Sequence, residues 1–369
     1  MKEPRLLILS ASTGNGHMSA AGALEAEAKS QGLWAQAVDV LDHVPKGFRA
    51  WYRGGYEQLV RKNPRTWGHL YKTSDRPLFN YQVQTVMDRQ FTRRIHHLIA
   101  ETKPDWVVCT HSLPQPRLAV ARKLYGFRMA IVVTDLYVHR MWLRGKPDHF
   151  FVPQEWSADV LEKRIPGSRA ITDVTGIPIH PLFTQPIDRA AFRAAHGIPD
   201  SATVALISSG GIGGGPMADA TDAVLNAGGH AVLITGRHEA ATRAMTQRYG
   251  GNSGVTVLGS IPQADMAAWM QSSEFLVSKP GGLTTFEALA SGLPFLVFWP
   301  FLIPGQEEGN AEFLEEQGAG MIARNVADLR YMARRLVDQP ETRSEMRRCA
   351  LAQAIPDSTQ RIIGRLREL

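Results

Sequence analysis

The stretch Arg5–His17, RLLILSASTGNGH, decides the fold of this chain. Four consecutive apolar residues lie at its start, and a short apolar run bounded by turn residues is typical of a strand buried on both faces. The segment Ser12–His17 follows, where Gly14 and Gly16 let the backbone approach a ligand closely. A helix expected over Ala20–Lys29 comes next, so a helix N-terminus faces the same loop. This order of strand, glycine loop and helix predicts a parallel α/β domain.

Short apolar runs of the same kind recur along the chain, with helical segments between them. They are Trp106–Thr110, Met129–Thr134 and His149–Val152 in the first half, and Val204–Ser208, Ala231–Thr235, Val255–Leu258, Phe275–Val277 and Phe295–Phe298 in the second. We therefore expect an α/β fold of two Rossmann-like domains that face each other across a cleft, with ligand at the carboxyl ends of the strands.

A proline-rich connector, Gly176–Pro186 (GIPIHPLFTQP), separates the two series of strands. Proline removes backbone donors and blocks helix, so this segment is a candidate domain boundary. We expect one domain over residues 1–183 and a second over 184–345. Residues 346–369 are expected to form a helical segment that packs back on the first domain.

Composition limits the classes of protein to which the chain can belong. Of its 369 residues 44% are hydrophobic, which excludes wholesale disorder and suits two domains with real cores. Two cysteines cannot form a disulfide framework and indicate a reducing, cytosolic setting. The longest apolar run, Leu293–Ile303, is too short to span a membrane, which needs about 20 residues.

The net charge of +6 has one main source, the segment Lys46–Arg94, which holds 11 basic and 3 acidic residues. Its candidate contact residues are Arg49, Trp51, Arg53, Arg61, Lys62 and Trp67. Aromatic rings among cations suit an anionic membrane surface, where the rings lie at headgroup level. Nucleic-acid stacking uses similar residues, and a solvated face with buried aromatics is the simpler alternative.

Two side chains at strand ends are candidate proton acceptors. His17 follows the first strand, and its ordinary pKa lies near the operating pH of a general base. Asp135 ends an apolar strand in Thr134–Trp142 (TDLYVHRMW), where His139 and Trp142 either line an acceptor path or pack. The alternative for each of the two residues is a purely structural function, in which its side chain caps a helix.

Three glycine-containing or polar loops follow strands of the second half. Gly210 and Gly211 lie in SSGGIGGGP, whose glycines suit backbone contact with phosphate but whose dinucleotide pattern is weak. In Ser278–Pro294 (SKPGGLTTFEALASGLP), Gly281 and Gly282 open a helix whose amides would face a diphosphate. Its Glu287 either accepts hydrogen bonds from ribose or closes a capping box with Thr284, and the spacing favours the box. In PGQEEGN, the side chains of Gln306, Glu307 and Asn310 suit sugar hydroxyls or begin a helix.

In combination these motifs resemble the monogalactosyldiacylglycerol synthase and processive diacylglycerol glucosyltransferase family of GT-B glycosyltransferases (family 28). The segments that carry the resemblance are GNGHMSA, TDLYVHRMW, TGIPIHPLF, SKPGGLTTFEA and PGQEEGNA, in this order, and it covers roughly residues 5–340. The resemblance implies a first domain that takes a lipid acceptor and docks on the membrane, and a second domain that binds a UDP-sugar.

The resemblance also implies roles for individual residues. His17 matches the proposed base, with Asp135 as the second candidate, and Glu287 matches the ribose-binding acid. The diphosphate-binding helix start is matched by Gly282, Leu283, Thr284 and Thr285, the sugar-facing residues by Gln306 and Glu307, and the uracil-recognition segment by Ser260 and Ile261. The basic aromatic segment matches the membrane-facing region.

The implied activity is inverting transfer of glucose or galactose from a UDP-sugar to 1,2-diacylglycerol, which gives a β-glycosyldiacylglycerol. Because the chain has no Asp-x-Asp, we expect neither a metal nor a cofactor. The implied partners are UDP-glucose or UDP-galactose, diacylglycerol and an anionic membrane, not nucleic acid, and the implied location is cytoplasmic and peripheral. The alternatives are another lipid or polyprenyl acceptor, a UDP-sugar 2-epimerase of the same fold, or a non-enzymatic sugar-nucleotide sensor.

Overall fold

The structure is a computed structural model that describes residues 3–14, 16–76, 81–210 and 215–369. Its chain divides into two compact units. The first contains residues 1–180, 304–306 and 357–369, and the second contains residues 181–303 and 307–356. No described helix is both long enough and apolar enough to cross a membrane.

The first unit is built on a six-stranded parallel sheet in the order β2-β1-β3-β4-β5-β6. Its strands are β1 (Leu6–Ser10), β2 (Ala35–Asp39), β3 (Trp106–Cys109), β4 (Arg128–Val132), β5 (His149–Val152) and β6 (Thr172–Val174). The chain moves outward from β1 to β2 and then returns to the other side of β1 at β3. The topological switch point therefore lies between β1 and β3, where open α/β sheets bind their ligands.

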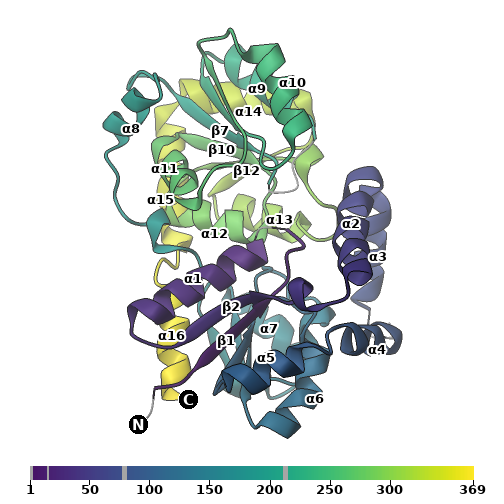
Figure 1. The fold of residues 1–369 in the computed structure, drawn as a ribbon. Coiled ribbons are helices and arrows are strands. Elements are labelled where there is room, and N and C mark those ends of the chain that lie inside the picture. The colour runs from purple at the N-terminus through teal and green to yellow at the C-terminus, as the bar shows by residue number, and fades with distance from the viewer. Residues whose placement is uncertain (1–2, 15, 77–80, 211–214) are drawn as a thin grey trace. The chain divides into compact units, whose positions relative to one another are not determined.

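Both faces of this sheet are buried, because its side chains alternate between two apolar clusters. Leu7 and Leu9 of β1 join the cluster under α5 (Ile95–Thr102), α6 (Gln115–Tyr125) and α7 (Glu155–Arg164). Leu6 and Ile8 join the opposite cluster, under α1 (Gly16–Ser30) and α16 (Ser358–Glu368). The last helix thus covers the same face as the first, and Figure 1 shows α16 beside α1.

The basic aromatic segment forms three consecutive helices after β2. They are α2 (Lys46–Lys62), α3 (Pro64–Ser74) and α4 (Gln82–Phe91), and α2 lies against α3 (Figure 1). Phe48 and Phe91 stack at 4.2 Å and join the apolar cluster of the sheet. A buried ion pair of 2.7 Å between Asp88 and Arg144 also attaches α4 to the rest of the unit.

The second unit repeats the plan with a six-stranded parallel sheet in the order β12-β11-β10-β7-β8-β9. Its strands are β7 (Val204–Ser208), β8 (His230–Ile234), β9 (Val255–Leu258), β10 (Phe275–Ser278), β11 (Phe295–Phe298) and β12 (Gly320–Ala323). Its helices are α8 (Arg189–Ala195), α9 (Met217–Asn226), α10 (Glu239–Tyr249), α11 (Gln263–Ser272), α12 (Gly282–Ala290), α13 (Glu308–Glu316), α14 (Val326–Asp338) and α15 (Pro340–Gln353). The switch point lies between β7 and β10, and the glycine-containing loops follow these strands.

The predicted α/β class and every predicted strand position are confirmed. Three further strands, β2, β6 and β12, were not predicted, because they are short edge strands without a run of large apolar residues. The units divide at 180/181 and 356/357, whereas the sequence suggested 183/184 and 345/346. The predicted segment 346–369 is split, since α15 packs against α12 in the second unit and α16 against α1 in the first.

Candidate functional site

In the first unit the candidate site lies where β1, β3 and β4 end, next to the switch point. The loop after β1 supplies Thr13, and the first turn of α1 supplies His17. Thr110 and His111 follow β3, and Thr134 and Asp135 follow β4. Side chains from three strand ends meet here because the carboxyl ends of parallel strands share one edge of the sheet.

The His17 imidazole is held through one ring nitrogen. Its Nδ1 lies 3.1 Å from the carbonyl oxygen of Thr110 and 2.7 Å from Oγ1 of Thr134. A carbonyl oxygen only accepts, so Nδ1 carries the proton and donates it there. The other nitrogen, Nε2, then carries a lone pair, and no described group bonds to it. The local contacts therefore give His17 the tautomer that a general base requires.

His111 stands beside His17 and has the opposite tautomer. Its Nδ1 accepts the backbone N–H of Leu113 at 3.0 Å, so its Nε2 carries the proton and donates to Oγ1 of Thr13 at 3.1 Å. The two imidazole rings meet edge to face, with centroids 4.7 Å apart. Because the Thr13 oxygen accepts from His111, its own hydroxyl hydrogen is available to a ligand.

The surroundings keep both imidazoles neutral. Burial lowers the pKa of His17, and the negative charge of Asp135 and the bond to Thr110 only partly oppose this effect. Burial also brings the pKa of His111 well below the usual range, and the neighbouring His17 adds to it. Asp135 is oriented by Trp142, whose indole Nε1 donates to Oδ2 at 3.0 Å. Asp135 thus lies close enough to influence His17 electrostatically.

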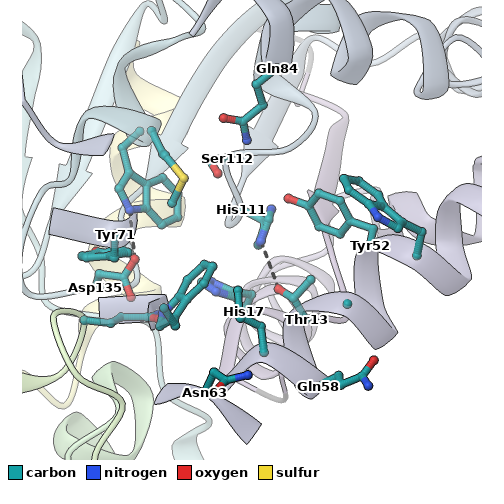
Figure 2. A pocket seen from close by; sticks show the side chains of 17 residues that line it. Thr13, His17, Tyr52, Gln58, Asn63, Tyr71, Gln84, His111, Ser112 and Asp135 are labelled. Atoms are coloured by element: carbon teal, nitrogen blue, oxygen red, sulfur yellow. Dashed lines mark hydrogen bonds between the residues drawn. The ribbon is translucent and has the colours of Figure 1, made fainter. Parts of the chain in front are cut away.

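His17 opens onto a pocket of about 580 Å³ that lies within the first unit. Figure 2 shows Thr13, His17 and His111 in the middle of the view, with Asp135 to their left and Tyr52 of α2 to their right. The remaining lining combines aromatic and apolar side chains with amide and hydroxyl groups, and half of it comes from α2 and α3: Trp51, Gly55, Gln58, Leu59, Asn63, Trp67, Tyr71, Gln84, Ser112, Met141, Trp142 and Gln306. A cavity in which aromatic and apolar walls adjoin a group of polar side chains suits an apolar ligand with a polar end.

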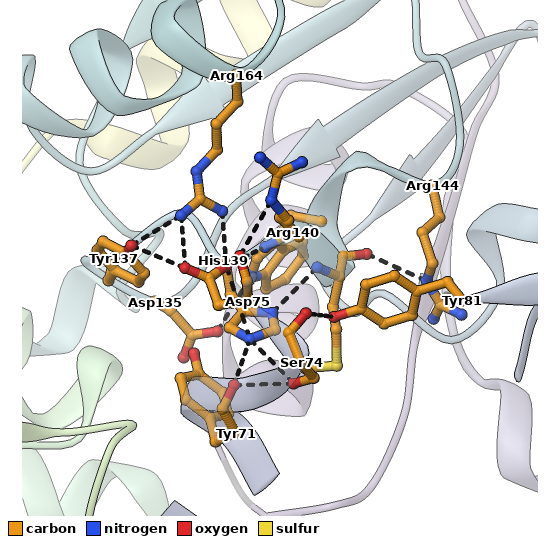
Figure 3. Close-up of polar contacts among 12 residues, drawn as sticks. Tyr71, Ser74, Asp75, Tyr81, Asp135, Tyr137, His139, Arg140, Arg144 and Arg164 are labelled. Atoms are coloured by element: carbon orange, nitrogen blue, oxygen red, sulfur yellow. Dashed lines mark hydrogen bonds and ion pairs between the residues drawn. The ribbon is translucent and has the colours of Figure 1, made fainter. Parts of the chain in front are cut away.

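A polar network at the end of α3 fixes one side of this pocket (Figure 3). Arg164 of α7 binds both carboxylate oxygens of Asp75, at 2.7 and 2.6 Å, and Tyr137 donates to Oδ2 of the same carboxylate at 2.8 Å. Burial alone would raise the pKa of Asp75, but its hydrogen bonds, first those from Arg164, lower it. Asp75 is therefore an ionised anchor that ties α3 to the sheet.

His139 belongs to this anchor and does not line the pocket. It is fully buried, its Nδ1 accepts from the backbone of Met141 at 3.1 Å, and its Nε2 lies 3.0 Å from the carbonyl oxygen of Tyr71. Both ring nitrogens are therefore committed to the protein. Trp142, proposed with it for an acceptor path, does line the pocket.

In the second unit, the start of α12 is the counterpart of this site. Gly281 is the N-cap, and the first helical amides, from Gly282 to Thr284, have no carbonyl partner within the helix. Glu287, on the same helix, has only 7% of its surface exposed and no hydrogen bond or ion pair with any described residue. Burial raises its pKa to about 8. A buried carboxyl group without a partner is available to a ligand's hydroxyl groups.

The capping box expected from Thr284 and Glu287 is wrong. The helix begins at Gly282, so Thr284 is the third helical residue and lies inside the first turn. Gly281 provides the N-cap position without any side-chain hydrogen bond. Glu287 is therefore left without a capping function.

The three polar residues after β11 that were predicted to contact the sugar lie in different places. Gln306 lines the pocket of the first unit. Glu307 is buried in the second unit, where its Oε2 accepts the backbone N–H of Ile303 at 2.7 Å and its Oε1 pairs with Lys279. Asn310 donates to the carbonyl oxygen of Pro280 at 2.7 Å. Glu307 and Asn310 thus hold the loops around the start of α12.

The other proposed residues lie as follows. Ser260 and Ile261 are in the loop between β9 and α11, and Gly210 follows β7 with a φ of +79°. Arg49 and Trp51 lie on α2, with Trp51 61% exposed. Gly14 precedes α1, and Gly16 is the first residue of that helix. Gly211 and the side chains of Arg53, Arg61 and Lys62 lie outside the described residues.

Sequence reasoning missed several residues of both sites. Thr110 and Thr134 act from strand ends far from His17 in sequence, and Tyr52 comes from a helix that was not predicted. His111 had a usable signal, because it directly follows an apolar strand, as Asp135 does. Lys279 lies inside the motif SKPGGLTTFEA, but no function was predicted for it.

Two known families match successive parts of the chain. Residues 17–179 match the family described as "Monogalactosyldiacylglycerol (MGDG) synthase". Residues 219–362 match the "Glycosyltransferase family 28 C-terminal domain". The first match contains His17 and the pocket helices, and the second contains α12.

Full-length relatives and solved structures agree with these matches. A "Processive diacylglycerol beta-glucosyltransferase" of Staphylococcus saprophyticus is 27% identical over 97% of this chain and 91% of its own. Among structures, Acinetobacter baumannii MurG has a TM-score of 0.61 at 16% identity, covering 99% of this chain and 100% of that one. The UDP-GlcNAc 2-epimerase of Neisseria meningitidis, bound to UDP-GlcNAc, has a TM-score of 0.64 at 15% identity, with 99% and 100% covered. The structural neighbours establish a GT-B fold.

The geometry of His17 predicts its titration. ¹⁵N NMR of histidine-labelled protein should show His17 protonated at Nδ1, with a pKa below the ordinary 6.5. Because the charge of Asp135 raises this pKa, Asp135→Asn should lower it further, while the asparagine oxygen still accepts from Trp142. A His17 protonated at Nε2, or a pKa that rises in the variant, would contradict this assignment.

Proposed function

The chain belongs to the glycosyltransferase family in which a monogalactosyldiacylglycerol synthase domain precedes a family 28 C-terminal domain, and we propose that it makes a glycolipid. The reaction moves a hexose, glucose or galactose, from a UDP-sugar to 1,2-diacylglycerol. The product is a β-glycosyldiacylglycerol, and the second product is UDP.

One observation carries this proposal: the unprotonated Nε2 of His17 belongs to a pocket whose walls from α2 and α3 are mainly aromatic and apolar. Diacylglycerol is an apolar molecule with a single free hydroxyl group. Its chains suit the walls from α2 and α3, and its hydroxyl group suits the polar end of the pocket, where His17 accepts and Thr13 donates.

The transfer step follows from this placement. The acceptor hydroxyl donates its proton to Nε2 of His17 as its oxygen attacks C1 of the hexose. The bond between C1 and the β-phosphate oxygen breaks at the same time, and its electron pair leaves with UDP. A single displacement of this kind inverts the anomeric carbon, so an α-linked sugar nucleotide gives a β-linked lipid. Asp135 favours the imidazolium that forms, because its charge raises the pKa of His17.

On the donor side, the proposal assigns UDP to the start of α12. The free amides from Gly282 to Thr284 suit the diphosphate, since a helix N-terminus attracts negative charge. The unpartnered carboxyl group of Glu287 suits ribose hydroxyls, and the loop with Ser260 and Ile261 suits the uracil. Because helix amides can stabilise the departing diphosphate, we propose that transfer requires no metal ion.

The same proposal places the first unit on the surface of an anionic membrane, on its cytoplasmic side. Its three basic aromatic helices each present an exposed apolar side chain: Trp51 on α2, Leu70 on α3 and Val86 on α4, which are 61%, 49% and 63% exposed. Apolar side chains among cations are the combination that holds amphipathic helices at a lipid interface. The lipid acceptor would then reach the pocket directly from the bilayer.

The function is tested by product analysis. The purified protein is incubated with diacylglycerol vesicles and UDP-glucose, UDP-galactose or UDP-GlcNAc, each separately, with and without EDTA. We expect a β-glycosyldiacylglycerol from a UDP-hexose, at a rate that EDTA changes less than about twofold. Conversion of UDP-GlcNAc to its 2-epimer without any lipid product would instead support the epimerase alternative, and a rate lost in EDTA would overturn the metal-free proposal.

The docking surface is tested by vesicle co-sedimentation. The main variant changes four cations together to Gln: Arg49, Arg53, Arg61 and Lys62. Its binding to anionic vesicles should be at least tenfold weaker, because each cation near such a surface contributes about 1 kcal/mol to the free energy of binding. Trp51→Ser should weaken binding to neutral and anionic vesicles alike.

Matched controls come from the second unit. The first is Tyr331→Ser, an exposed aromatic side chain of α14. The second is a quadruple Gln variant of the exposed arginines Arg243, Arg248, Arg334 and Arg348. Equal losses in the test variants and these controls would contradict a docking surface on α2–α4.

A further inference from the structure

Lys279 is an unusual cation of the second unit, both in its residue type and in its position in the sheet. It is the only lysine between residues 164 and 369, where all other cationic side chains apart from histidine are arginines. It directly follows β10, whose neighbours are β7 and β11, and so lies at the switch point of the second sheet. Open α/β sheets bind their ligands at this point.

The Lys279 side chain lies against Gly210, which follows β7. A Cβ atom added to Gly210 would come within 2.8 Å of Cε of Lys279, so a side chain at position 210 would require Lys279 to shift. The positive φ of Gly210, +79°, also favours glycine there. The side chain of Lys279 thus lies beside Gly210, a residue that the sequence indicates as a phosphate-binding candidate.

The Lys279 ammonium group lies beside the N-terminus of α12. A Cβ atom added to Gly281, the N-cap, would lie 4.0 Å from Nζ of Lys279 and 3.6 Å from Oε1 of Glu307. The ammonium group and the free helix amides therefore converge on one place. Among the described residues only Glu307 pairs with Nζ, so two of its three donor positions remain for a ligand.

Glu307 holds the ammonium group in this position. The side chains of Lys279 and Glu307 are only 16% and 5% exposed. Oε2 of Glu307 is fixed by the backbone N–H of Ile303, which leaves Oε1 for the lysine. A buried ion pair contributes little net stability, because both ions lose their hydration. The ion pair lies beside the N-terminus of α12. This position fits a function in stabilising the negative charge of a ligand better than a function in folding.

We propose that Lys279 stabilises the diphosphate that departs from the sugar, and that Glu307 is the positioning residue for Lys279. This inference rests on the proposed function. When the bond between C1 and the β-phosphate oxygen breaks, its electron pair remains on that oxygen, and Nζ of Lys279 donates a hydrogen bond to it. Lys279 keeps its proton throughout, and the proton of the acceptor hydroxyl goes to His17. Fixed donors aimed at a developing negative charge lower the barrier, because they need no reorganisation.

The test compares binding of UDP and UMP, which differ by the β-phosphate that Lys279 is proposed to contact. The main variant is Lys279→Met with Glu307→Gln, which removes both charges and so leaves no buried ion unpaired. Calorimetry should show UDP bound about tenfold more weakly than by the wild type, and UMP bound equally well. The single-turnover transfer rate from saturating UDP-sugar should fall about 100-fold.

Two further variants separate a functional from a structural effect. Lys279→Arg keeps the charge and should recover most of the preference for UDP over UMP. Arg243→Met, at an exposed arginine of α10, should match the wild type in every measurement. Thermal unfolding of all variants checks that the second unit remains folded.

The outcomes distinguish this inference from the function on which it rests. A wild-type protein that binds no UDP would overturn the proposed function itself. In another outcome the wild type binds UDP and transfers hexose, while the double variant keeps the same preference for UDP over UMP and the same transfer rate. That result would overturn only the assignment of Lys279. Equal loss of UDP and UMP binding in the double variant would also overturn it, since a β-phosphate contact cannot affect UMP.

Discussion

The hydrogen bond from Nδ1 of His17 to the carbonyl oxygen of Thr110 is the contact on which the proposed chemistry depends. It joins the first turn of α1 to the end of β3 and fixes which nitrogen carries the proton. Thr134, at the end of β4, completes the support. Three parallel strands must therefore end in register for Nε2 to be unprotonated at the pocket. The tautomer of His17 is therefore fixed by residues at the edge of the sheet, and not by the glycine loop alone.

The two units use the same edge of the same kind of sheet for opposite electrostatic tasks. In the first, burial keeps His17 and His111 neutral, so that a proton can be accepted near an apolar ligand. In the second, helix amides and Lys279 provide positive charge, while burial of Glu287 raises its pKa and leaves a carboxyl group for hydroxyl ligands. The excess positive charge of the sequence lies elsewhere, on α2–α4, which fits a membrane surface and not the nucleotide site.

The sequence was sufficient for the strands and for the loops that follow them, because buried parallel strands are continuous apolar runs and their ends carry the polar residues. It was insufficient wherever a partner lies far along the chain. Thr110 and Thr134 reach His17 only through strand pairing, and Lys279 meets Glu307 only where two loops converge. The capping box failed because two glycines let α12 begin earlier than Thr284. The charges and aromatic rings of Lys46–Arg94 indicated a surface, but composition alone did not show which rings line the pocket.

The most direct test of the account is the rate of hexose transfer by His17→Ala, measured together with its affinity for UDP. His17 lies in the first unit, and the proposed UDP site lies in the second. We therefore expect transfer to fall at least 1,000-fold, at the upper part of the range for removal of a general base, while UDP binds as tightly as to the wild type. Transfer at the wild-type rate would contradict the assignment of His17 as the base.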